Sequence, residues 1–175
     1  MPRRQAGFGE SHDWAVGTRQ TIRERLLSSA VNPERLGRPQ RCRALLFDPD
    51  GERILVIGRA RPGREPYVVF PGGGLDDTDL TPRDGIRREL QEELGLRDAD
   101  YELDDLVIPH NDQYYFIGRL HAGVETFVVG GPEATRDPAI SGTYSPQLLP
   151  LRDLVSCRAY PEEITALIAV AVKLA

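Results

Sequence analysis

The chain has 175 residues, of which 40% are hydrophobic, so it can build one domain with a packed core, and a wholly disordered protein is excluded. The formal net charge of −5 argues against a protein whose main task is to clamp the backbone of nucleic acids. A small phosphorylated ligand stays compatible with this charge, because a few local arginines decide such binding.

Cysteine usage and the length of the apolar runs bear on the cellular compartment. Cys42 and Cys157 are far apart in the sequence and form no CxxC pattern, which is typical of reduced thiols. Residues 1–14 contain two arginines with no apolar segment after them, so they do not resemble a secretory signal. The longest apolar run, residues 164–172, is too short to cross a bilayer. We therefore expect a cytoplasmic protein without a membrane partner.

Residues 1–40 are interpreted as an N-terminal extension and residues 41–175 as the main domain. Apolar residues recur at helical spacing between Thr21 and Gly37, which predicts a short amphipathic helix in the extension. This helix either packs on the domain or mediates a homodimer, and packing is the favoured alternative.

The main domain begins with a predicted hairpin over residues 41–59, whose strands are joined by the turn residues 48–51. A third short strand, residues 67–70, leads into three consecutive glycines. A long Gly- and Pro-rich loop over residues 130–146 precedes a final helix at residues 161–175. This mixture predicts an α/β or α+β layered domain. Three further strands are predicted at residues 101–109, 113–122 and 125–129.

A central helix has clear start and stop signals. Thr81 can cap its N-terminus, Pro82 suits the first helical position, and Gly95 ends it as a left-handed residue. Three apolar residues form a stripe that faces the core: Ile86, Leu90 and Leu94. Three glutamates at positions i, i+3 and i+4 share another face, at the edge of the core and near the glycines: Glu89, Glu92 and Glu93.

This acidic face has two interpretations. It is either a solvated surface, relieved by Arg83, Arg87 and Arg88, or a site for a divalent cation. The carboxylates converge instead of alternating with lysines, and they follow a Gly-Gly-Gly turn that permits close backbone approach. Three hard oxygen ligands are what Mg²⁺ or Mn²⁺ prefers, so the cation is favoured.

The segment GGGLDDTDLTPRDGIRRELQEELGL resembles the Nudix box, which would run from Gly73 to Leu96. Its second half, from Arg88 onward, matches every fixed position of the box. In the first half the family usually has a glutamate at a set distance before the Arg-Glu pair, and Leu80 stands there. Asp79 takes that place if the loop is one residue longer, and we expect Asp79 or a neighbouring aspartate to substitute. The resemblance implies a Nudix-type α/β/α sandwich, with a mixed sheet between helices, over residues 41–175.

The resemblance also implies a chemistry for the box. Nudix proteins typically hydrolyse a nucleoside diphosphate linked to another group, X. The three glutamates Glu89, Glu92 and Glu93 would hold Mg²⁺, or Mn²⁺, against the pyrophosphate, with the backbone carbonyl of Gly73 as a further ligand. Arg88 would orient a helical glutamate.

The other candidate site residues lie outside the box. The general base would be a glutamate of the box or one from a later loop, where Glu133 and Glu125 are candidates; a surface carboxylate is the alternative for each. Tyr115 could stack on a base or line a pocket. Three arginines beside the strand before the glycines could reach a phosphate, with solvated loop arginines as the alternative: Arg59, Arg61 and Arg64.

The box does not name X, and no subgroup signature matches cleanly. The segments 114–120, 131–133 and 145–154 are similar to small bacterial Nudix enzymes that act on nucleoside triphosphates, so a nucleoside triphosphate, or a modified one, is the first candidate. ADP-ribose, a nucleotide sugar or a dinucleoside polyphosphate are the alternatives. A non-catalytic Nudix module that binds a nucleotide is the competing class. Hydrolysis is favoured because all three helical glutamates are present, and no stable nucleic-acid partner is expected.

Overall fold

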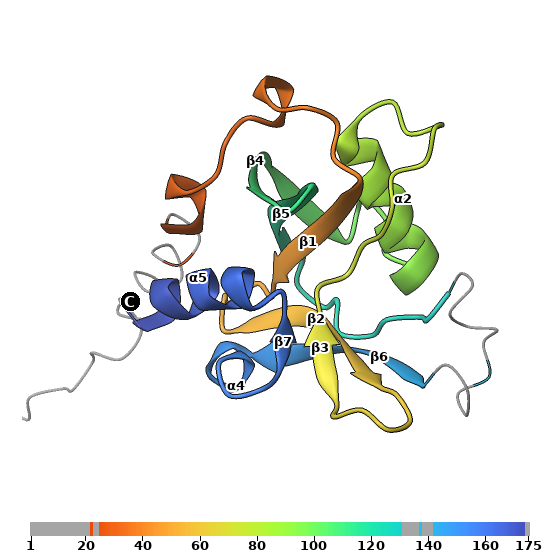
Figure 1. The fold of residues 1–175 in the computed structure, drawn as a ribbon, viewed down its shortest axis with the longest axis vertical. Helices are drawn as coiled ribbons and strands as arrows, with labels where there is room; N and C mark the ends of the chain where they lie inside the picture. Colours follow the sequence, from red (N-terminus) through yellow and green to blue (C-terminus); the bar gives the residue numbers. More distant parts are fainter. Residues whose placement is uncertain (1–21, 23–24, 131–136, 138–141, 174–175) are drawn as a thin grey trace, which may run out of the picture.

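The computed structural model describes residues 22, 25–130, 137 and 142–173, and Figure 1 shows their arrangement. Residues 22 and 25–28 are helical. The remaining elements follow in this order: η1 (Pro33–Arg35), β1 (Arg41–Phe47), β2 (Arg53–Ala60), β3 (Tyr67–Val69), α2 (Pro82–Leu94), β4 (Tyr101–His110), β5 (Gln113–Leu120), β6 (Thr143–Pro150), α4 (Leu151–Leu154), β7 (Ala159–Tyr160) and α5 (Glu162–Lys173).

Seven strands form one mixed sheet in the order β4-β5-β1-β2-β3-β7, with β6 paired to β2. The pairs β1–β5 and β3–β7 are parallel, and the other pairs are antiparallel. β1 and β2 pair at Phe47 and Ile54, near the turn that joins them. Toward the start of β1, the segment that follows β3 replaces β2 as the hydrogen-bonding partner. The N–H groups of Ala44 and Cys42 donate to the carbonyls of Pro71 and Gly73, both at 2.9 Å. The glycine turn therefore lies where β1 and β2 diverge.

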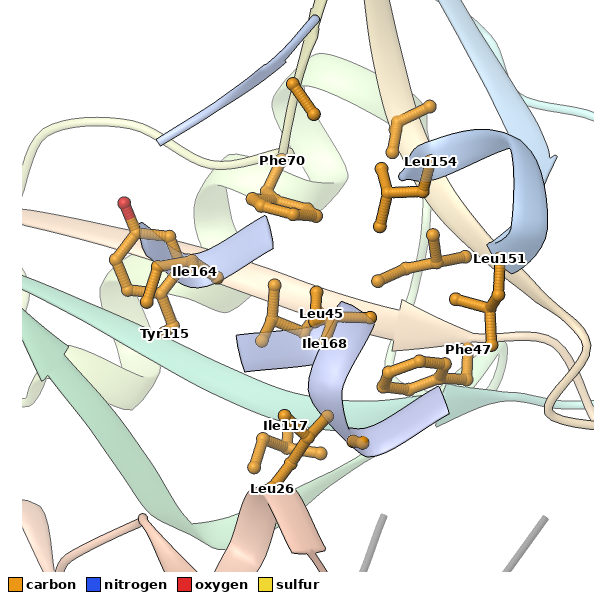
Figure 2. Packing of buried hydrophobic residues seen from close by; sticks show 14 of the residues in the cluster. Leu26, Leu45, Phe47, Phe70, Tyr115, Ile117, Leu151, Leu154, Ile164 and Ile168 are labelled. Carbon is orange, nitrogen blue, oxygen red and sulfur yellow. The ribbon is translucent and has the colours of Figure 1, made fainter. Parts of the chain in front are cut away.

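Helices cover both faces of the sheet, as the sequence predicts (Figure 1). One apolar cluster holds α2 residues such as Ile86 and Leu90 against β1, β2 and β5. The other cluster holds Ile164 and Ile168 of α5 together with α4, and Figure 2 shows this packing around Phe70. Because both faces are buried, successive residues of the central strands are apolar instead of alternating with polar ones.

The helical residues before β1 pack on the domain. Leu26 is fully buried in the cluster that contains α5, and Figure 2 places it beside Ile117. The Arg25 Nη1 group donates to the carbonyl of Ala171, at 3.3 Å. These contacts within one chain favour packing over dimerisation. The helix is shorter than the predicted span, because Val31 pairs with Val107 of β4. The division of the chain at residue 40 stays a prediction.

We expect Leu26→Ala to lower the free energy of unfolding by about 2–3 kcal/mol, because it leaves a cavity between the N-terminal helix and α5. Chemical denaturation of both proteins measures this difference. Leu80→Ala is the matched control, because Leu80 is 89% exposed. Equal stability of the Leu26 variant and the native protein would mean that the N-terminal helix is not part of the core.

Two predictions are wrong: the strand at residues 125–129 and the extent of the loop at residues 130–146. Residues 125–129 form no strand, because this segment lies against the end of α2: the N–H groups of Val128 and Gly130 donate to the carbonyls of Leu94 and Glu93. The backbone groups that a strand would pair thus satisfy the free carbonyls of a helix end instead. Conversely, β6 lies partly inside the predicted loop. It contains Pro146 and, among the described residues, pairs with β2 alone, which is the edge position at which a strand tolerates proline.

Within the described residues, none of the helices combines the length and the apolar character needed to span a bilayer. Cys42 and Cys157 are both free thiols.

Candidate active site

A cleft of about 450 Å³ lies between α2, the glycine turn and side chains of β1, β2, β3 and β6. Its lining combines the acidic helix face with a larger number of basic groups. Besides Ile57, Val69 and the three glycines 72–74, the lining residues are Glu89, Glu92, Glu93, Arg41, Arg43, Arg59, Arg61, Tyr67 and Tyr144.

The position of α2 is fixed by its ends, and the predicted signals are confirmed. The Thr81 side chain accepts the N–H of Asp84, and the Asp84 carboxylate accepts the N–H of Thr81, at 2.9 Å, which makes a capping box. Gly95 ends the helix with φ 68°. With the apolar stripe buried in the core, the rotation of α2 is set, and the glutamates lie beside the glycine turn.

The glycine turn approaches α2 too closely for side chains. Gly72 has φ 121°, and a Cβ there would overlap the carbonyl of Cys42. A Cβ on Gly73 would lie 2.5 Å from the Glu89 carboxyl group. The turn therefore brings the peptide backbone against a carboxylate, as the sequence predicts for a Gly-Gly-Gly segment.

Arg88 connects the acidic face to the loop. Its Nη1 donates to Glu89 Oε1 at 3.1 Å and to Glu92 Oε2 at 3.0 Å. Its Nη2 donates to the carbonyl of Gly74 at 2.9 Å. The same guanidinium thus holds two of the three glutamates and one residue of the glycine turn. This arrangement supports the predicted positioning role of Arg88.

Asp79 occupies the position expected for the loop carboxylate. Arg88 Nε and Nη2 donate to its two carboxylate oxygens, at 3.1 and 3.0 Å, and the Asp76 N–H donates to it at 2.8 Å. Asp79 is buried, and the Arg88 guanidinium keeps the pKa of its carboxyl group below the usual value. Leu80 is 89% exposed. The loop is therefore one residue longer than the box pattern, and the arginine partner is an aspartate.

Glu93 and Glu89 are the less exposed members of the acidic face. The N–H of Gly72 donates to Glu93 Oε2 at 3.0 Å. Burial raises the pKa of both carboxyl groups, while Arg88 opposes the shift at Glu89 and the Gly72 N–H opposes it at Glu93. Repulsion from Glu92 also raises the pKa of Glu89, and repulsion from Glu89 raises the pKa of Glu93. A bound cation would relieve this repulsion.

The donor set fits a hard divalent cation, because it consists of carboxylate oxygens beside a backbone turn. As the side chains stand, the described residues contain no three acidic, histidine or cysteine groups close enough to hold one ion. The contacts explain this: Glu89 and Glu92 are directed at Arg88, and Glu93 is directed at the Gly72 N–H. The Gly73 carbonyl accepts the Cys42 N–H and keeps one lone pair, so its role as a ligand stays a prediction.

Arg59 lies on the face of the sheet that forms the cleft floor. It is the register partner of Tyr144 on β6 and of Tyr67 on β3, and its guanidinium lies 5.1 Å from the centre of the Tyr144 ring. Arg61 also lines the cleft, and its role as a phosphate-binding group stays a prediction. Arg64 does not: it lines a neighbouring cavity.

Arg43 lies behind the glycine turn. Its Nη1 donates to the carbonyl of Phe70 at 3.1 Å and to the carbonyl of Gly72. Burial lowers the pKa of this guanidinium, and the nearby Glu93 carboxylate raises it. A positive charge is thus held within the wall of the cleft, close to the acidic face.

Tyr115, a predicted substrate-binding residue, lies in the core instead of the cleft. It is 1% exposed and makes an edge-to-face contact with Phe70, at 6.3 Å between ring centres (Figure 2). The face of β5 that carries it is covered by α5, so alternation along the strand does not expose it. Glu125 pairs with Arg53 and does not line the cleft. Glu133 lies outside the described residues.

Four charged or aromatic lining residues were not predicted from the sequence: Arg41, Arg43, Tyr67 and Tyr144. Tyr67 lies two residues before Val69 in the strand that leads into the glycine turn. Because side chains two residues apart in a strand share a face, this spacing would have placed Tyr67 on the side of the cleft. Arg41 and Arg43 are likewise two residues apart in β1 and share a face, because they alternate with buried residues. Tyr144 carried no signal, because its strand was not predicted.

Three solved structures, all under 25% identical in sequence, share this fold. A MutT protein described from Aliivibrio salmonicida and Vibrio cholerae is 15% identical, with a TM-score of 0.53, and the match covers 79% of this chain and 100% of that one. The Ap4A hydrolase of C. elegans is 12% identical (TM-score 0.52; 75% and 93% covered). An ADP-ribose pyrophosphatase from Streptococcus suis is 22% identical (TM-score 0.51; 77% and 92% covered).

A search of curated proteins gives no match. The model of the NUDIX domain family matches residues 37–144, which is more than half of the chain and includes the glycine turn, α2 and every residue named above as lining the cleft. The mixed sheet between helices agrees with the α/β fold of the solved structures. The capped acidic helix, its loop and the match of the family model lead to one conclusion: this chain belongs to the Nudix family.

Proposed function

We propose that this protein is a Mg²⁺-dependent pyrophosphohydrolase, with Mn²⁺ as an alternative metal, which cleaves a nucleoside diphosphate linked to a group X. The observation that carries the proposal is the composition of one cleft, where three glutamates from α2 face four arginines. Carboxylates that gather a divalent cation, next to guanidiniums that bind phosphate oxygens, suit a phosphoric anhydride. Nudix enzymes generally use divalent metals, which agrees with this composition.

In this proposal Glu89, Glu92 and Glu93 hold the metal. When bound, the metal neutralises charge on the phosphates and lowers the pKa of a water molecule. Arg88 keeps Glu89 and Glu92 in position through its Nη1 contacts. The Gly73 carbonyl supplies a further oxygen.

The reaction adds a water oxygen to one phosphorus atom, and the bond from that phosphorus to the bridging oxygen breaks. A glutamate takes the proton of the water, and the bridging oxygen leaves with the other phosphate. The base is a carboxylate of the box or Glu133. Arg41, Arg59 and Arg61 line the cleft where they can bind the phosphate oxygens that do not react, and the charge of Arg43 lies within the wall behind them.

For X, a nucleoside triphosphate or a modified one is the first candidate. Support comes from the strand and loop segments that are similar to small bacterial enzymes of this type. The alternatives are ADP-ribose, a nucleotide sugar and a dinucleoside polyphosphate. The competing class is a non-catalytic module that binds a nucleotide in the same cleft. The complete set of helical glutamates favours hydrolysis.

The test is the release of phosphate or pyrophosphate in Mg²⁺ from a panel of nucleoside triphosphates, ADP-ribose, dinucleoside polyphosphates and nucleotide sugars. We expect turnover of at least one substrate, and its loss when EDTA removes the metal. Nucleotide binding by calorimetry without turnover of any substrate would support the binding module instead. Absence of both binding and turnover would support a solvated acidic face.

We further propose that the protein acts in the cytoplasm on a free small-molecule nucleotide, without a stable nucleic-acid or membrane partner. The two free thiols and the acidic net charge support this view. A homodimer stays the alternative role of the N-terminal extension. Size-exclusion chromatography with light scattering distinguishes monomer from dimer.

A further inference from the structure

A second cavity, the outer pocket, adjoins the active-site cleft. It has a volume of about 480 Å³, and Tyr67 lines both cavities. The other residues of the outer pocket come from the loop between β2 and β3 and from the segment that enters β7: Gly63, Arg64, Glu65, Arg158 and Tyr160. The cleft therefore continues sideways across the sheet, away from α2.

A row of side chains crosses four neighbouring strands and joins the two cavities. Tyr144 and Tyr67 are the register partners of Arg59 on either side. The rings of Tyr67 and Tyr160 meet edge to face, with centres 5.6 Å apart. Because neighbouring strands lie about 4.8 Å apart, this row extends over roughly 14 Å from β6 to β7. It provides a continuous surface of aromatic rings and one guanidinium.

The outer pocket has the chemistry of a site for a planar, anionic group. Tyr160 is 38% exposed, so part of its ring is accessible. Arg64 and Arg158 are exposed, and neither forms an ion pair with another residue in the part of the chain that the structure describes. Glu65 is the only acid in the lining. Arginine binds phosphate through two parallel hydrogen bonds, and tyrosine rings stack on nucleobases.

We propose that the outer pocket is a second subsite, which holds the distal nucleotide of a dinucleoside polyphosphate. Tyr160 and Tyr67 contact its base, and Arg64 and Arg158 bind the adjoining phosphates. The pyrophosphate to be cleaved then lies at the acidic face of α2. This inference rests on the proposed function and narrows it: of the candidates for X, it selects the one with a second base. A nucleoside triphosphate has a single base and leaves the outer pocket empty.

The test compares hydrolysis of diadenosine tetraphosphate and of ATP by the native protein and by two variants, Tyr160→Leu and Arg158→Gln. We expect each substitution to raise KM for the dinucleotide about 10-fold, because a stacked base or a phosphate contact is worth about 1–3 kcal/mol. The kinetic constants for ATP should change less than about 2-fold. Arg152→Gln is the matched control, because Arg152 is an 85% exposed arginine on α4, outside both cavities.

The outcomes test the proposed subsite separately from the proposed function. Turnover of ATP without turnover of the dinucleotide overturns the subsite and leaves the function standing. An equal loss for both substrates also overturns it, because the residues would then act on the whole site. If neither substrate is hydrolysed, the full panel of substrates decides on the proposed function, and calorimetry tests the subsite by itself. Equal affinity of the native protein and the Tyr160→Leu variant for diadenosine tetraphosphate in Mg²⁺ would then overturn the subsite.

Discussion

Replacing Glu93 by Gln is expected to lower kcat by about 10³-fold, which corresponds to about 4 kcal/mol of transition-state stabilisation. Glu93 is partly buried and faces the glycine turn, where Gly72 N–H donates to it at 3.0 Å. Gln retains the shape and an oxygen that can accept this bond, so the backbone stays in place. Only the negative charge that would attract the metal is removed. Steady-state hydrolysis in saturating Mg²⁺ measures the effect.

The same substitution should not reduce stability. Burial and repulsion from Glu89 raise the pKa of the Glu93 carboxyl group, so its charge is unfavourable in the protein alone. A neutral side chain removes this repulsion, and we expect a melting temperature equal to or above that of the native protein. A fall in activity with unchanged or higher stability is the pattern of a functional charge that is kept at the expense of stability.

Glu102→Gln is the matched control for charge. Glu102 lies on β4, where it pairs with Arg119 at 3.2 Å, and it does not line the cleft. Its removal should leave kcat within about 2-fold, since an exposed ion pair contributes about 0–1 kcal/mol. A Glu93 variant that keeps more than one tenth of the native kcat would show that this carboxylate is not needed for the metal.

The parts of the site that sequence analysis predicted correctly depend on local rules. The start and end of α2 follow from Thr81, Asp84 and Gly95, which act on the backbone of their own helix. The direction of the acidic face follows from the spacing of the glutamates relative to the apolar stripe. The close approach of the glycine turn follows from the absence of side chains. None of these features needs knowledge of a distant segment.

The parts that could not be predicted depend on pairing between distant segments. The row formed by Tyr144, Arg59, Tyr67 and Tyr160 joins β2 and β3 to β6 and β7, which lie far along the chain, and Tyr144 enters the row through the register of β6 with β2. Tyr115 lies on a strand that has both faces covered. The two-residue repeat therefore predicts the face on which its side chain lies, but it does not predict whether that face is exposed. Residues 125–129 have the composition of a strand, yet they bind the end of a helix.

The loop carboxylate, for which the sequence offers Asp79 or a neighbouring aspartate, could be predicted only in part. Counting along the sequence restricts the loop carboxylate to a few residues but does not choose among them. The choice is made by three hydrogen bonds, two from Arg88 and one from Asp76 N–H, which reach Asp79. We expect Asp79→Asn to lower the free energy of unfolding by about 3–4 kcal/mol, because it removes the buried negative charge that pairs with Arg88 Nε and Nη2. Urea denaturation at pH 7 measures this change.

Activity should fall with stability in this variant. Once released from Asp79, Arg88 can shift relative to Glu89 and Glu92, and a lost positioning contact typically costs 10–100-fold in metal affinity or activity. Leu80→Gln is the control, with an expected change within about 0.5 kcal/mol, because this side chain is exposed. If Leu80→Gln were the more damaging change, the loop would follow the regular spacing of the box after all.

The pH dependence of stability distinguishes a charge effect from a packing effect at Asp79. Arg88 holds the pKa of the folded carboxyl group below its value of about 3.9 in an unfolded chain. A lowered pKa in the folded state gives a stabilisation that is complete above the unfolded pKa and is lost as the pH falls through the folded pKa. The stability difference between the native protein and Asp79→Asn should therefore be constant from pH 7 to about pH 5 and shrink below about pH 4. A difference that stays constant down to pH 3 would assign the effect to packing, and the Arg88–Asp79 ion pair would then not stabilise the loop.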